Sequence, residues 1–302
     1  MTGGETCRLC GSGRAGPRFR ESGLSLLECA DCRTLFRPRG EEPENPAAYY
    51  DEDYYLDTWP GSLGRFFHHF NPKQHHKTRF LERQLAEFEG VFGGPGRLLD
   101  VGCANGVLVF MAKERGWEAE GIEVSEFAAS WGREQFGINI REGVIEDLAP
   151  EPAYHVITLF DTLEHVPEPQ KMIRECYDRL LPGGVLAVLT PDTLSLVNHL
   201  VHAAQRLSPK RAQGLMKQLY HEDHLCFFNR EALSRALIET GFLLSWMEGY
   251  DEDPRDTETR GLTKLGVYLA RAAASVIHRQ HEVLYWARKI QSHPEEKYGL
   301  TG

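Results

Sequence analysis

Residues 98–106 read LLDVGCANG, an apolar run that carries Asp100 and ends in a turn of small residues. The next residues, 107–115, have the apolar spacing of a helix, so the stretch predicts a strand, a tight turn and a helix. The small residues of the turn are Gly102, Ala104 and Gly106. With so little side-chain bulk, the backbone can approach a ligand closely at the helix N-terminus. We therefore expect a nucleotide-like cofactor at this turn.

The spacing of the small residues in the turn helps to distinguish a dinucleotide from other nucleotide-like cofactors. A dinucleotide fingerprint needs a small residue at its sixth position, where this chain has Val107, so NAD is the less favoured cofactor. Residues 117–124 predict a second strand that ends near Glu123. The Glu123 carboxylate is suited to accept hydrogen bonds from both hydroxyls of a ribose.

Asp100, the small-residue turn and Glu123 together resemble class I S-adenosylmethionine-dependent methyltransferases. The resemblance implies that the turn packs on the methionine part of the cofactor, that Asp100 helps to hold its amino group, and that Glu123 binds its ribose. It implies further cofactor contacts from Val124, Val144, Ile145, Phe160 and Asp161. For Val144 and Ile145, packing in the core is an equally good interpretation.

The segment around this turn alternates strands and helices. Further strands are expected at 138–142, 154–160, 185–189 and 242–247, and helices at 125–135, 168–181 and from Asn229 to just before Gly241. This alternation predicts an α/β fold with a doubly wound, mostly parallel, Rossmann-like sheet. We assign residues 93–250 to this domain, with an acceptor-site insertion at about 193–228.

Composition limits the classes of partner. The chain has 302 residues, with 34 basic and 44 acidic side chains and a formal charge of −10, which disfavours nucleic acid as a partner. No stretch approaches the ~20 apolar residues that span a bilayer, and the N-terminus lacks an export signal. We expect a cytoplasmic monomer or homodimer, with no membrane partner, that acts on a small-molecule acceptor.

Four of the seven cysteines form two CxxC pairs, Cys7 with Cys10 and Cys29 with Cys32, separated by 18 residues. This spacing is typical of a four-cysteine zinc ribbon, which we assign to residues 1–40, and structural zinc would supply much of its folding free energy. The segment also carries seven arginines. Binding of RNA or of a phosphorylated partner is therefore an alternative role for it.

Residues 41–92 are expected to form a linker and a helical lid. Four tyrosines lie in this segment, at Tyr49, Tyr50, Tyr54 and Tyr55. They could line an acceptor pocket, although packing onto the main domain is the favoured interpretation. A helical pattern over 65–88 carries four histidines, which point in different directions and do not predict a metal site.

The chemistry is expected after the strand at 154–160, where the chain reads FDTLEHVP over residues 160–167. His165 is the candidate base. A similar acid-x-x-Glu-His run binds a divalent metal in ubiquinone-pathway O-methyltransferases and in small-RNA 2'-O-methyltransferases. By that resemblance Asp161, Glu164 and His165 would be the ligands; because metal-free relatives carry the same run, we do not favour a metal here.

A second polar cluster, YHEDH, occupies residues 220–224. It resembles the Tyr-His-Glu-His run of C-methyltransferases that act on nucleotide-linked keto-sugars and that also carry an N-terminal zinc site. The resemblance implies that four residues join His165 around the acceptor, namely Tyr220, His221, Glu222 and His224. Asp223 departs from that pattern, and a surface loop is the alternative interpretation.

Residues 251–302 carry an apolar stripe at helical spacing, so a helical C-terminal extension is expected, folded back on the domain in preference to forming a dimer helix. Taken together, the sequence predicts a methyltransferase that uses S-adenosylmethionine to methylate oxygen or carbon of a small molecule in a biosynthetic pathway. One alternative is RNA-directed or metal-assisted O-methylation. The other is a partner-binding zinc ribbon joined to a domain that binds cofactor without turnover.

Overall fold

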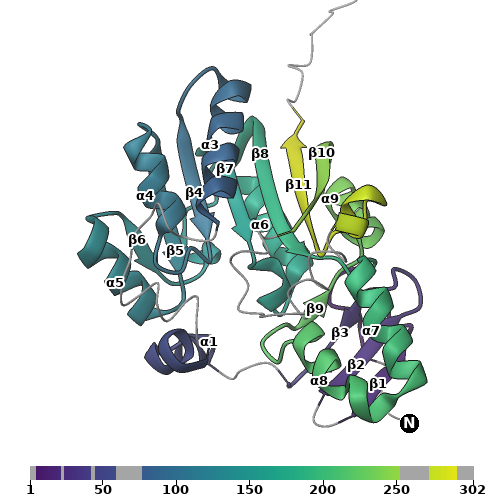
Figure 1. Ribbon diagram of the computed structural model, residues 1–302. Helices are drawn as coiled ribbons and strands as arrows, with labels where there is room; N and C mark the ends of the chain where they lie inside the picture. The colour runs from purple at the N-terminus through teal and green to yellow at the C-terminus, as the bar shows by residue number, and fades with distance from the viewer. Residues whose placement is uncertain (1–4, 22–23, 42–44, 59–76, 252–271, 291–302) are drawn as a thin grey trace, which may run out of the picture.

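A seven-stranded sheet forms the centre of the part of the chain that the computed structural model describes, residues 5–21, 24–41, 45–58, 77–251 and 272–290 (Figure 1). The strands are β4 (Arg97–Val101), β5 (Glu118–Glu123), β6 (Ile140–Glu142), β7 (Tyr154–Phe160), β8 (Leu180–Pro191), β10 (Phe242–Tyr250) and β11 (Glu282–Lys289). Their order is β10-β11-β8-β7-β4-β5-β6. From β8 to β6 all neighbours pair in parallel, which confirms the predicted doubly wound sheet.

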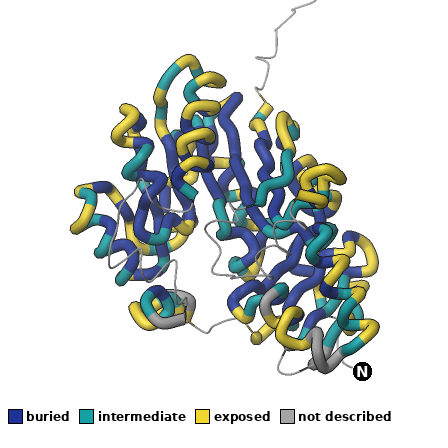
Figure 2. Tube along the Cα trace, viewed as in Figure 1, coloured by how far each residue is buried: buried dark blue, intermediate teal, exposed yellow. Residues whose placement is uncertain are grey.

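Within the described residues, three helices cover one face of the sheet and two cover the other. The first set is α3 (Thr78–Phe92), α4 (Val107–Glu114) and α5 (Glu126–Phe136), and the second is α6 (Pro169–Arg179) and α9 (Arg230–Thr240). Leu98 and Val156 face the first set, whereas Leu99 and Ile157 face the second, because successive strand residues point to opposite faces. Figure 2 shows the resulting buried strands beneath helices that are exposed on their outer sides.

The helix ends follow the capping signals of the sequence. The Ser125 side chain accepts a hydrogen bond from the Ala128 amide at the start of α5, and Gly137 ends that helix in the left-handed conformation. Asn229 caps α9 in the same way as Ser125 caps α5. The helix expected over 168–181 ends two residues early, at Arg179, because strand β8 already begins at Leu180.

The N-terminal segment forms a separate sheet with part of the insertion. Its strands are β1 (Ala15–Glu21), β2 (Leu24–Cys29), β3 (Leu35–Phe36) and β9 (Cys226–Phe227), and the insertion adds helices α7 (Leu196–Leu207) and α8 (Pro209–Leu219). We call this four-stranded antiparallel sheet the ribbon sheet. In Figure 1 it lies beside α7 and α8. The buried Arg8 side chain joins it to the main domain by donating to the Pro167 carbonyl at 3.2 Å.

The expectation of a helical C-terminal extension was wrong over residues 282–289. This segment is strand β11, which lies between β8 and β10 and pairs antiparallel with both. The run from Val283 to Ala287 is buried throughout. A strand covered on both faces has a continuous apolar run instead of an alternating one, and the spacing of such a run does not distinguish it from a buried helix.

Short elements complete the described chain. They are α1 (Pro46–Tyr49), a π-helical turn (Tyr54–Thr58) and two 3₁₀ turns (Ile145–Asp147 and Leu163–His165). The four histidines considered above as a metal site fall at residues 68–76, outside the described residues. Among the helices that are described, none combines the length and the apolar character needed to cross a bilayer.

Candidate active site

The candidate site lies where the order of the strands reverses. Strand β4 has β5 on one side and β7 on the other, and the chain fills the first side before it crosses to the second. Ligands of open α/β sheets bind at the carboxyl ends of the strands next to such a switch point. The ends of β4, β5 and β7 carry Asp100, Glu123 and Phe160.

The turn after β4 has the backbone shape that its small residues allow. Gly102, Ala104 and Gly106 have φ of +69°, +48° and +76°, in the left-handed region. A Cβ atom at Gly102 would lie 2.7 Å from Thr162 Oγ1, and one at Gly106 would lie 2.5 Å from Ile138 Cδ1. Larger residues at either glycine would therefore clash as well as strain the backbone.

Two buried carboxylates flank this turn. Thr158 Oγ1 donates to Asp100 Oδ1 at 2.6 Å, yet burial raises the pKa of the Asp100 carboxyl to about 7. Glu123 accepts the amides of Ala104 at 2.8 Å and Ser125 at 3.0 Å, and burial raises its pKa as well. Two buried acids side by side make the site favourable for a cation such as the ammonium or sulfonium group of a ligand.

The other expected cofactor residues differ in exposure. Val144 is 43% exposed, so its side chain is open to a ligand, whereas Ile145 is fully buried in the core. Core packing is thus the correct interpretation of the Ile145 side chain. Val124 and the Phe160 ring are half-buried, and that ring lies 5.2 Å from the ring of Phe80.

His165 lies just beyond the end of β7 and is held through its Nδ1 atom. Nδ1 is 3.1 Å from the Asp223 carbonyl oxygen, 3.8 Å from Asp223 Oδ2 and 3.2 Å from the Tyr50 hydroxyl. Tyr54 in turn donates its hydroxyl to Asp223 Oδ2 at 2.8 Å. The site thus joins the N-terminal linker, the end of β7 and the 220–224 loop.

The contacts of Asp223 and Tyr50 with His165, and of Tyr54 with Asp223, were not foreseen. The sequence interpretation treated Asp223 only as a departure from a known run, and it favoured plain packing for Tyr50 and Tyr54. The only sequence signal for a role of Asp223 was its place in a dense polar cluster ahead of an apolar stretch. Thr158, which bonds Asp100, stands in a buried strand and gave no sequence signal at all.

Glu164, His165 and His224 form a second cluster of polar side chains. Their ligand atoms all lie within 4.8 Å of one another. Burial, followed by the charge of Asp161, raises the pKa of Glu164 to about 8, and Thr190 donates to Glu164 Oε2 at 3.0 Å. The buried Nδ1 of His224 has no hydrogen-bond partner in the described part of the chain, and burial holds the pKa of this imidazole well below its usual value. This donor set fits a divalent cation.

Asp161 does not join that group, although the sequence resemblance placed it there. Its carboxylate forms an ion pair with Lys77, the residue that precedes α3. The three clustered residues therefore include His224 in place of Asp161. The sequence could not indicate this exchange because His224 lies 63 residues after Asp161 in the chain.

The remaining residues of the YHEDH run separate. The Tyr220 hydroxyl is 2.7 Å from His202 Nε2, so Tyr220 belongs with helix α7 and not with His165, contrary to the expected acceptor role. The His221 ring lies 5.4 Å from that of His224. Glu222 is exposed. Its side chain was expected at the acceptor, but the chain turns at residues 222–223, which leaves Glu222 at the surface and buries Asp223 and His224.

The four N-terminal cysteines form a compact group. Cys7 Sγ lies 3.6 Å from Cys32 Sγ, Cys10 Sγ lies 3.6 Å from Cys29 Sγ, and all four sulfurs are within 4.8 Å of one another. A tetrahedral zinc with Zn–S bonds of about 2.3 Å places its sulfurs about 3.8 Å apart. In both loops the amide just after the second cysteine bonds the carbonyl of the first at 3.0 Å. The cluster therefore fits a structural zinc ion.

Comparisons with known proteins agree with this geometry. A family model described as "Methyltransferase domain" matches residues 73–244. The ubiquinone biosynthesis O-methyltransferase of Leptothrix cholodnii is 31% identical over 205 residues, which cover 65% of this chain and 81% of that protein. A protein of the same description from Marinobacter nauticus is 38% identical over 103 residues, which cover 31% of this chain and less than half, 43%, of that protein.

A solved structure shares the fold at low sequence identity. It is the magnesium protoporphyrin IX methyltransferase of Synechocystis PCC 6803 with bound S-adenosylhomocysteine (SAH), with a TM-score of 0.53 and 13% identity. The match covers 78% of this chain and 97% of that one. At this identity the likeness shows the fold alone.

Proposed function

The chain belongs to the family of S-adenosylmethionine-dependent methyltransferases that share this methyltransferase domain, and on that premise we propose that it methylates a hydroxyl oxygen of a small molecule. The observation that carries the proposal is the contact of His165 Nδ1 with the Asp223 carbonyl at 3.1 Å. A carbonyl oxygen only accepts hydrogen bonds, so Nδ1 holds the proton of the neutral ring and Nε2 is the proton acceptor. An acceptor hydroxyl bonded to Nε2 loses its proton to His165 as the methyl group is transferred.

Asp223 and the tyrosines support this role. The Asp223 carboxylate, 3.8 Å from Nδ1, stabilises the imidazolium that forms when His165 takes the proton. Tyr54 orients that carboxylate by donating to it, and the Tyr50 hydroxyl lies 3.2 Å from the same Nδ1 atom of His165. The ubiquinone biosynthesis O-methyltransferases among the relatives favour oxygen over carbon as the acceptor atom.

On the cofactor side, S-adenosylmethionine supplies the methyl group as a sulfonium. Asp100 holds the ammonium of its methionine part, and Glu123 accepts from the ribose hydroxyls with the lone pairs that the backbone amides leave free. The narrow turn from Gly102 to Gly106 lets the backbone contact the methionine part. We expect Val124, Val144 and the Phe160 ring to contact the adenosine, whereas the Asp161 carboxylate is paired with Lys77.

A metal-assisted form of the same reaction is the second candidate. It is favoured by the buried His224 Nδ1 that lacks a partner among the described residues, next to Glu164 and His165. A divalent cation held by these three residues would acidify the acceptor hydroxyl. Binding would displace the proton that Glu164, with its pKa of about 8, carries at neutral pH.

The base role is tested with His165→Ala and a matched control, His199→Ala, which removes an exposed histidine from α7. Both variants are expected to bind S-adenosylmethionine like the unchanged protein, measured by calorimetry. Only His165→Ala should slow transfer of a labelled methyl group, by about 100-fold or more. If His165→Ala transferred the methyl group as fast as the unchanged protein, His165 would not be the base.

The acceptor class is tested with ¹³C-methyl-labelled cofactor and two pools of acceptor, a small-metabolite extract and total RNA. The chemical shift of the transferred carbon distinguishes an oxygen-bound from a carbon-bound methyl group. We expect an oxygen-bound label in the small-molecule pool. Label on carbon, or only in RNA, would refute the proposal.

The two forms of the reaction are separated by calorimetry with Mg²⁺ and Mn²⁺ on protein that has been treated with chelator. Metal-assisted transfer requires binding that is lost in Glu164→Gln and His224→Ala, together with activity restored by the added ion. Full activity after chelation, with no heat of Mg²⁺ or Mn²⁺ binding, would exclude the metal-assisted form and support base catalysis by His165 without a metal.

A further inference from the structure

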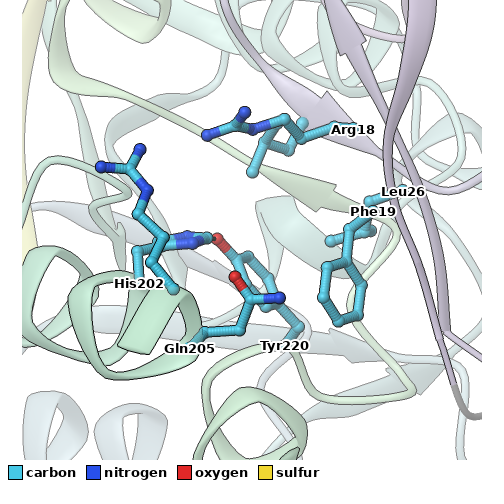
Figure 3. Close-up of a pocket in the computed structure, with 8 residues that line it drawn as sticks. Arg18, Phe19, Leu26, His202, Gln205 and Tyr220 are labelled. Carbon is cyan, nitrogen blue, oxygen red and sulfur yellow. Dashed lines mark hydrogen bonds between the residues drawn. The ribbon is translucent and has the colours of Figure 1, made fainter. Parts of the chain in front are cut away.

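A small cavity lies between the ribbon sheet and the insertion helices, away from the sheet edge that carries Asp100. Its volume is about 110 Å³, and its walls come from β1, β2, β3, α7 and the residue that follows α8 (Figure 3). Phe19, Leu26 and Leu35 form its apolar side. The opposite side is polar and is not used by the methyl-transfer reaction described above.

Positive charge converges on this cavity from two elements. Arg18 reaches it from β1 and Arg206 from α7. Within the described residues no ion pair involves Arg206, and Arg18 has one long contact, 3.4 Å from its Nε to Glu28 Oε2. Glu28 is bound more closely by Arg33, at 2.7 Å. Both arginines of the cavity are therefore available to an anion.

The back wall holds hydrogen-bonding groups beside these charges. Tyr220, which is buried, and His202 face each other at 2.7 Å, and Figure 3 shows the side chains of Arg18 and Gln205 on either side of this pair. Burial, and then the charges of Arg18 and Arg206, lower the pKa of His202. Since both arginines act on His202, their combined field extends into the cavity and attracts negative charge.

We propose that this cavity binds a tetrahedral oxyanion of the phosphate type, either free phosphate or the phosphate of a monoester. Its donors approach from two opposing elements, which suits the several oxygens of a tetrahedral group better than the single plane of a carboxylate. A cavity of about 110 Å³ has room for a phosphate group.

The site stands apart from the acceptor cluster but touches it through one ring. The ring of Phe227 in strand β9 packs on Tyr220, with centroids 4.9 Å apart, and on His224, with centroids 5.6 Å apart. A bound phosphate would order Tyr220 and thereby the strand that precedes α9. The proposal does not depend on the identity of the methyl acceptor.

Calorimetry on the zinc-loaded full chain, with inorganic phosphate as the probe, tests the site. We expect saturable binding of one phosphate per chain that weakens about tenfold or more in Arg18→Gln and in Arg206→Gln. Arg174→Gln, which removes an exposed arginine from α6, is the charge-matched control and should bind as the unchanged protein does. Affinities unchanged in both cavity variants would overturn the proposal.

A further variant gives an effect of opposite sign, which misfolding cannot produce. Glu28→Gln removes the carboxylate that competes for Arg18, so phosphate should bind several-fold more tightly. Weaker or unchanged binding would contradict the role given to Arg18.

The probes also identify the kind of anion. Phenyl phosphate that binds more tightly than inorganic phosphate would assign a monoester whose apolar part contacts Phe19, and equal affinities would assign free phosphate; both results support the site. Acetate that binds as tightly as phosphate would overturn the preference for a tetrahedral group.

Discussion

Replacing Asp100 by Asn is expected to stabilise the cofactor-free protein, and to do so more strongly at pH 8 than at pH 5. Burial raises the pKa of this carboxyl from an ordinary value of 3.8 to about 7, so the folded protein disfavours its charged form. The destabilisation is absent below the unfolded pKa, grows as the pH rises between the two pKa values, and is complete above about pH 7. Asn keeps an oxygen that can accept from Thr158 and carries no charge.

The size of the effect follows from the pKa difference. Each pKa unit corresponds to about 1.4 kcal/mol, so the destabilisation by Asp100 is about 2 kcal/mol at pH 5 and about 4 kcal/mol at pH 8. The gain in unfolding free energy from Asp100→Asn should therefore be about 2.5 times larger at pH 8 than at pH 5. Cofactor affinity should change in the opposite direction, by about tenfold or more, because the ammonium group of S-adenosylmethionine loses its ion partner.

Urea unfolding at pH 5 and pH 8, followed by tryptophan fluorescence without cofactor, measures this difference. Glu134→Gln, at an exposed position of α5, is the control and should show little dependence on pH. A stability difference between Asp100→Asn and the unchanged protein that is the same at both pH values would refute the reasoning. So would cofactor affinity that is unaffected by the substitution.

Three further predictions concern the turn, the linker and the cysteines. Gly102→Ala should destabilise the domain by about 1–3 kcal/mol in urea unfolding, since it combines a positive φ with a contact of 2.7 Å to Thr162. Tyr54→Phe should leave cofactor affinity unchanged, lower kcat several-fold and shift its pH profile, because Asp223 loses the donor that orients it. Removal of one zinc per chain by a strong chelator, or Cys10→Ser, should abolish the β-sheet circular dichroism of the ribbon; retention of that signal without metal would count against a structural zinc.

The elements around the cofactor turn could be predicted from the sequence because their signals are local. Ser125, Gly137 and Asn229 stand at helix ends where their side chains or their backbone freedom act within a few residues. The run from Leu98 to Gly106 combines strand, turn and helix signals in one stretch. Such patterns need no knowledge of distant parts of the chain.

The acceptor side could not be predicted in the same way because its contacts join distant segments. Tyr54 and Asp223 are 169 residues apart, and His165 and Tyr50 are 115 apart. The YHEDH run looked like one functional unit, yet the backbone turns within it and sends Tyr220 and Asp223 to different neighbours. Strand β11 was missed for a related reason, because only its place between β8 and β10 explains its uniform burial.

The pairing of β3 with β9 has a consequence for how the protein can be divided. Leu35 and Phe36 are bonded to Phe227 and Cys226, so the last strand of the N-terminal sheet is contributed by a segment almost two hundred residues later. Arg37 also donates to the His224 carbonyl at 3.1 Å. A fragment that begins after residue 41 would expose an unpaired edge next to its own histidine, and the excised N-terminal piece would lack a strand. The N-terminal segment and the methyltransferase domain therefore cannot be transferred separately to another protein. A chimaera must exchange both together.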